Sequence, residues 1–165
     1  MAYLILTLLS LAAFGVYLAY SLIRIGRVPQ SFSSTYYLLG RTGQWFTVVM
    51  FAMAFLILPG LVEVTPDPWR IVAFLCPAAI AFVGAAPEFK ITFALKVHQT
   101  AAIIAAVMGI LWVVFFSGHW WVLPVSLVLA GYLAHRTMTV DDCKVFWLEM
   151  VAFSSVYTAL ILALL

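Results

Sequence analysis

Five ionisable residues carry the side chains in this sequence that could act together in chemistry: His98, His135, Glu88, Asp142 and Glu149. Each lies near the end of an apolar run, and threading these runs as alternating helices places all five at one level of a membrane. Two imidazoles and two or three carboxylates could hold zinc or iron, with His98, His135 and Glu149 as the metal ligands, or could relay protons. An ionisable residue inside a membrane span is in itself a reason to expect a functional site.

The same residues also have a structural interpretation. The stretch 139–142 fits the pattern of a helix cap, and acids are favourable at a helix N-terminus. Glu149 could pair with Lys96 or Arg136 and hold helices in register. The sequence contains no H-x-x-x-H, H-E-x-x-H or C-x-x-C motif. We therefore expect structural pairing and no cofactor, and we keep a bound metal ion as the alternative.

A second candidate region is the loop 25–44, which mixes hydroxyl and aromatic side chains. Pro29 could open a short helix and Gly40 could end it. One interpretation is a re-entrant segment that lines a site, and the other is an interfacial helix anchored by its tyrosines. No G-x-S-x-G motif surrounds the serines, so none is predicted to be a nucleophile. The candidate lining residues are Ser31, Ser33, Ser34, Tyr36 and Tyr37.

Composition determines the class of protein and the elements that position these residues. Of the 165 residues, 67% are hydrophobic and 8% are charged, whereas a soluble domain is about one quarter charged. A membrane-spanning helix needs about 20 apolar residues. We predict one domain, an all-α polytopic transmembrane helical bundle of about six spans, at about 2–23, 45–62, 71–86, 97–117, 120–134 and 145–165.

The basic residues predict how this bundle is oriented. Seven of the eight fall on one side of the threaded chain, and only Arg70 falls on the other. Short cytoplasmic loops carry the excess of Lys and Arg, so the loop 25–44 is predicted to be cytoplasmic and both termini to be outside. The seven are Arg24, Arg27, Arg41, Lys90, Lys96, Arg136 and Lys144.

Small residues predict which helices pack closely. Ala101, Ala105 and Gly109 recur every four residues in the fourth span, and the third span, 71–86, is also rich in alanine. Such ridges let helix backbones approach each other in lipid. We expect the ridge to face the third span, and we keep a seam between two copies of the chain as the alternative.

Three stretches resemble a known group of proteins. Residues 28–37, 82–90 and 97–98 are similar to segments of a family of small polytopic membrane proteins from gut Bacteroidetes and their mobile elements. The similarity follows the order of the chain. It implies a multi-pass protein of the bacterial inner membrane and brings no known activity.

Three classes of function remain open. The first is a non-enzymatic accessory or interaction protein, with the bilayer and either a second copy or another membrane protein as partners. The alternative is a transporter or channel for ions, protons or small molecules, although the spans hold few charges for that role. The third is a membrane-embedded, metal-dependent hydrolase with a cytoplasm-facing site. The net charge of +2 is spread over loops, so nucleic acid is not an expected partner.

Overall fold

The computed structural model describes residues 1–85, 92–137 and 143–165, and every regular element in these ranges is a helix. This confirms the all-helical fold expected from composition. Six helices are long, and each overlaps one of the predicted spans: α1 (Ala2–Ile25), α3 (Gln44–Val64), α4 (Arg70–Ala85), α5 (Thr92–Phe115), α6 (Val122–Thr137) and α7 (Lys144–Leu164). Two short elements, α2 (Thr35–Leu38) and the 3-10 helix η1 (Gly40–Gly43), join α1 to α3.

Four of the helices in the described ranges are long and apolar enough to cross a membrane. These stretches are Ala2–Ile25, Gly40–Val64, Lys96–Phe115 and Lys144–Leu164. The other two, α4 and α6, are apolar but have 16 residues each within the part of the chain that the structure describes. Sixteen residues extend about 24 Å along a helix axis, which is less than the hydrocarbon thickness of about 30 Å.

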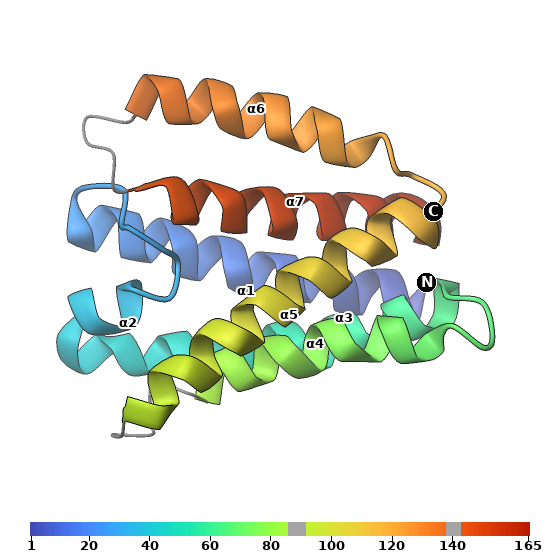
Figure 1. The fold of residues 1–165 in the computed structure, drawn as a ribbon, viewed down its shortest axis with the longest axis horizontal. Helices are drawn as coiled ribbons and strands as arrows, with labels where there is room; N and C mark the ends of the chain where they lie inside the picture. The colour runs from blue at the N-terminus through green and yellow to red at the C-terminus, as the bar shows by residue number, and fades with distance from the viewer. Residues whose placement is uncertain (86–91, 138–142) are drawn as a thin grey trace.

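Successive long helices run in opposite directions, and both chain termini lie at the same end of the bundle (Figure 1). Helix α3 packs between α1 and α4, α7 contacts α1, α5 and α6, and α6 lies at the edge beyond α7. Helix α5 crosses the other helices obliquely, from α4 at one end to α7 at the other.

This arrangement collects basic residues at the end of the bundle that holds α2. Arg24 closes α1, Lys96 lies in the first turns of α5, Arg136 is near the end of α6 and Lys144 begins α7. Arg70, at the start of α4, lies at the opposite end. Lys90 lies outside the described residues.

Polar groups link the helices inside the bundle. The Ser10 hydroxyl of α1 donates to the Met53 carbonyl of α3 at 3.1 Å and lies 2.6 Å from the Tyr157 hydroxyl of α7. The Trp112 indole of α5 donates to the Thr65 hydroxyl, just after α3, at 2.7 Å. In an apolar surrounding, such bonds satisfy groups that would otherwise be costly to bury.

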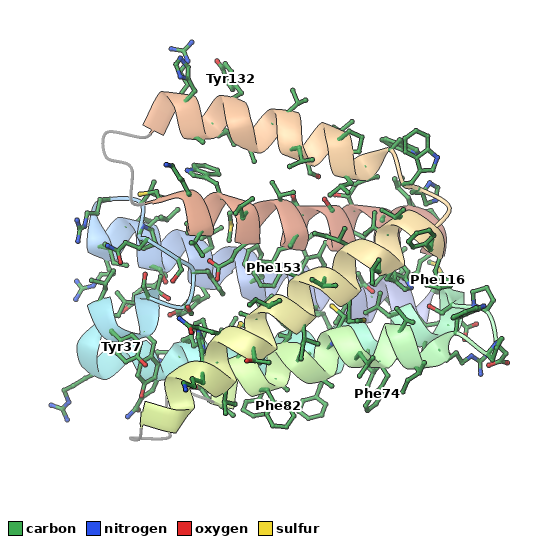
Figure 2. All side chains as sticks on the ribbon, viewed as in Figure 1. Tyr37, Phe74, Phe82, Phe116, Tyr132 and Phe153 are labelled. Carbon is green, nitrogen blue, oxygen red and sulfur yellow. The ribbon has the colours of Figure 1, made fainter. Side chains whose placement is uncertain are left out.

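Glycine allows the closest helix contacts. A Cβ atom on Gly109 would lie 2.9 Å from Val156 Cγ2 of α7 and 3.4 Å from Cys76 Sγ of α4. The end of the alanine ridge therefore faces α4, within the predicted third span, and also faces α7. In contrast, Phe74 and Phe82 of α4 point away from the bundle (Figure 2), as apolar side chains do on a face that contacts lipid.

Candidate functional site

The segment that follows α1 turns back into the bundle. The Phe32 side chain is 1% exposed, and its ring centroid lies 5.2 Å from Phe14, 5.6 Å from Tyr17, 5.6 Å from Phe46 and 5.8 Å from Phe153. These rings belong to α1, α3 and α7, so Phe32 fills the space between three helices. The first part of the loop 25–44 is therefore anchored inside the bundle by Phe32.

The predicted short helix in this loop begins later than expected. It starts at Thr35, not at Pro29, because the preceding residues extend into the bundle to bury Phe32. The Thr35 hydroxyl holds this position through a contact of 2.8 Å with the Tyr17 hydroxyl of α1. At the far end, Gly40 has a φ of 55°, a left-handed conformation that glycine adopts without strain.

Most of the predicted lining hydroxyls stabilise a turn and do not line a site. The Ser34 hydroxyl donates to the Ser31 carbonyl at 2.7 Å, and the Ser34 amide donates to the Ser31 hydroxyl at 3.1 Å. The Ser33 hydroxyl lies 3.1 Å from the Ser31 hydroxyl, and Ser33 also lines an internal cavity. Tyr36 packs against the core, whereas Tyr37 is 71% exposed.

Glu149 holds the segment that contains Phe32 against α7. Its Oε2 atom accepts a hydrogen bond of 2.5 Å from the backbone amide of Phe32. One turn earlier, the Phe146 amide donates to the Gln30 carbonyl at 3.0 Å. The first amides of a helix have no partner within the helix, so Gln30 supplies an acceptor for one of them. We call these two bonds, together with the buried Phe32 ring, the Glu149 latch.

An internal cavity of about 60 Å³ lies beside this latch. Residues from α3, α4, α5 and α7 line it, and Glu149 is the one charged side chain among those described. Liquid water occupies roughly 30 Å³ per molecule, so the cavity has room for about two waters. Its α7 wall extends from Glu149 to Tyr157, a distance of about 12 Å along the helix. The arrangement is a carboxylate at one end of a narrow, mainly apolar chamber.

Several residues that line this cavity between α5 and α7 are not fully buried. Ala102, Ala105 and Ala106 of α5 and Ala152 and Phe153 of α7 all line the cavity and are only half-buried. The small alanine side chains at four of these positions leave the chamber close to the surface of the bundle.

The described residues do not bring the predicted polar cluster together. His98 hydrogen-bonds to the backbone of Val83 on α4, and His135 is exposed near the end of α6. Within the described ranges, no group of three or more His, Cys, Asp or Glu side chains could hold a metal ion. The expected metal ligands His98, His135 and Glu149 are therefore not assembled, because α6 lies at the edge of the bundle. Asp142 and Glu88 lie outside the described residues.

The cations expected to pair with Glu149 have other surroundings. The Arg136 guanidinium lies 5.5 Å from the centroid of the Tyr132 ring on α6. Lys96 lines a groove on the outside of α4 and α5. Neither forms an ion pair with Glu149, whose described partner is the Phe32 amide.

Sequence reasoning missed Phe32, and the signal that could have found it is a lone bulky apolar residue among serines.

Comparisons of the chain with protein-family models, with curated proteins and with solved structures give no match. The site therefore has to be interpreted from its own geometry. That geometry offers a hydrogen-bond acceptor in an apolar chamber, and a polar latch between the first loop and the last helix.

Proposed function

We propose that the chain is a non-enzymatic accessory or interaction protein of the bacterial inner membrane. It spans the membrane six times, with both termini outside and the loop 25–44 on the cytoplasmic side. In this proposal the internal polar groups hold the helices in place, and the outer surface contacts lipid and either a second copy or another membrane protein. The family resemblance of residues 28–37 supports the bacterial membrane, and the basic end of the bundle supports the orientation.

The observation that carries this proposal is the hydrogen bond that Glu149 accepts. Its described hydrogen bond goes to a backbone amide 117 residues away in the sequence, so its geometry is that of a structural link. The serines that could have supplied a nucleophile bond to one another in the turn at residues 31–34. His98, a candidate base, bonds to the backbone of Val83. Catalysis by nucleophile and base needs these groups within hydrogen-bond reach of each other.

The topology can be tested by labelling single cysteines in intact cells. Cys143 is replaced by Ser, and cysteine is introduced at Tyr37, which is exposed on α2, or at Asp67, which is exposed at the opposite end. An impermeant maleimide is expected to label the variant at position 67 and not the variant at position 37. Labelling at position 37 alone would reverse the orientation, and labelling of both would contradict a single topology.

The interaction role is tested by photo-crosslinking in living cells. A photoreactive amino acid is placed at Val16 of α1, Phe55 of α3 or Val128 of α6, all of which are exposed. An interaction protein is expected to give a discrete protein adduct from at least one of these faces. Adducts with lipid alone from all three faces, and from neighbouring exposed positions, would contradict the proposal.

The internal cavity favours a second candidate, transport of protons or a small molecule. A lone carboxylate in a chamber with room for water is the kind of group that proton relays use. Reconstituted liposomes loaded with a pH-sensitive dye can separate the two proposals. Transport predicts a flux that Glu149→Gln abolishes and that Glu63→Gln, at an exposed position on α3, leaves intact. The accessory role predicts no flux above that of protein-free liposomes.

A further inference from the structure

An elongated groove lies on the outside of the bundle between α4 and α5, separate from the internal cavity. Its volume is about 490 Å³, within the range of about 300–1,000 Å³ that is typical of small-molecule sites. It extends along α5 from Lys96 to Ile104, about 12 Å of helix. It therefore begins at the basic end of the bundle and extends toward its middle.

The groove exists because small residues face one another between larger ones. Ala79 of α4 and Ala101 of α5 form its floor, and each is 6% exposed. Phe82 and Ile104 stand at its sides and are 60% and 40% exposed. Phe82 extends outward from α4 (Figure 2). Since the floor is sunk and the sides project, the groove can hold one flexible apolar chain.

Charge distinguishes one end of the groove from the other. Lys96 lines the groove at the end that holds α2 and is exposed there. Thr100 follows one helical turn deeper on the same face and adds a hydroxyl. Beyond Thr100 the lining residues are apolar. The groove therefore presents a cation and a hydroxyl at its mouth and hydrocarbon along its length.

We propose that this groove binds one anionic phospholipid, with the phosphate at Lys96 and an acyl chain along the α4–α5 floor. The cation at the mouth is complementary to a phosphate, and basic pockets between membrane helices on the cytoplasmic side are known to hold anionic head groups. A helix from a second copy would fit less well, because it would cover the Lys96 ammonium and remove it from water. The inference does not depend on whether the chain is an accessory protein or a transporter.

The test measures lipid retained by the purified full chain in native mass spectrometry. The detergent-solubilised protein is mixed with equal amounts of dioleoylphosphatidylglycerol and dioleoylphosphatidylcholine. Wild type is expected to retain phosphatidylglycerol preferentially. Lys96→Gln is expected to lower that preference about five-fold, which corresponds to the ~1 kcal/mol that one Lys contributes near an anionic membrane surface. Arg136→Gln, which removes an exposed cation from α6, is the matched control and should keep the preference.

A second pair of variants tests the apolar part of the groove. Ala78→Leu fills the groove from α4 and is expected to reduce retention of both lipids, whereas Ala12→Leu adds the same bulk on an exposed face of α1 and should not. Excess inorganic phosphate should leave the bound phosphatidylglycerol in place, because free phosphate lacks the acyl chain. Equal losses of preference from Lys96→Gln and Arg136→Gln would overturn the proposal. So would a dimer that Ala78→Leu converts to a monomer, because the occupant would then be a second copy.

Discussion

Replacing Glu149 tests whether the latch stabilises the fold. Glu149→Ala removes the acceptor of the Phe32 amide and leaves that amide in the interior of the bundle. Glu149→Gln keeps an oxygen of nearly the same position and shape but removes the charge. The pair of variants therefore separates what the hydrogen-bond acceptor contributes to stability from what the charge contributes.

The expected losses follow from the surroundings of Phe32. This residue is almost fully buried, and a buried donor without a partner costs about 1–3 kcal/mol. Glu149→Ala should therefore lower the free energy of unfolding by about that amount. A hydrogen bond to a neutral acceptor is about half as strong as one to a charged acceptor. Glu149→Gln also relieves the burial of a charge, so its net loss should stay below ~1 kcal/mol.

The measurement is equilibrium unfolding in mixed micelles, followed by tryptophan fluorescence. Glu63→Ala, at an exposed position on α3, is the control and should change stability by less than ~0.5 kcal/mol. If Glu149→Ala is no more destabilising than Glu63→Ala, the latch contributes nothing and the reasoning fails. If Glu149→Gln is as destabilising as Glu149→Ala, the charge matters and not the acceptor.

Two further substitutions test the packing of the bundle. Gly109→Leu should lower the stability of the bundle by about 1–3 kcal/mol, because its side chain would meet Val156. Gly131→Leu, where no atom lies within 4 Å of the added Cβ, is the control and should be near neutral when both variants are melted in detergent. Equal melting temperatures for the two variants would place Gly109 at the lipid surface. Tyr157→Phe removes the hydroxyl that contacts Ser10 and should cost about 1 kcal/mol by the same assay, whereas an unchanged melting temperature would show that water replaces the lost contact.

The helices could be predicted from the sequence because each one is a continuous apolar run. A membrane-length apolar run is easy to recognise, and charged or aromatic residues such as Arg24, Trp45 and Lys144 mark the ends of these runs. The predicted boundaries therefore differ from the observed helix boundaries by only a few residues. The start of α2 could not be predicted this way. It depends on the burial of Phe32 between α1, α3 and α7, and such long-range contacts leave no local pattern.

The candidate site was harder to predict for a geometric reason. Threading a helix across a membrane predicts the level of a residue, and it predicts one level for His98, His135 and Glu149. It does not fix the rotation of each helix about its axis, nor which helices are neighbours. His135 is exposed because α6 lies at the edge, and His98 bonds to α4. Of these three residues, only Glu149 lines the internal cavity.

The span of the Glu149 latch has a consequence for how the chain is made. Phe32 is synthesised early, yet its acceptor is added 117 residues later. At roughly 5–20 residues per second, about 6–23 s pass between the two. During that interval the first loop has neither the Glu149 carboxylate nor the Phe153 ring to bind, so Phe32 can contact only the rings of α1 and α3. The insertion of α7 then completes the structure, and a chain stopped before α7 would expose the first loop to proteases that wild type resists.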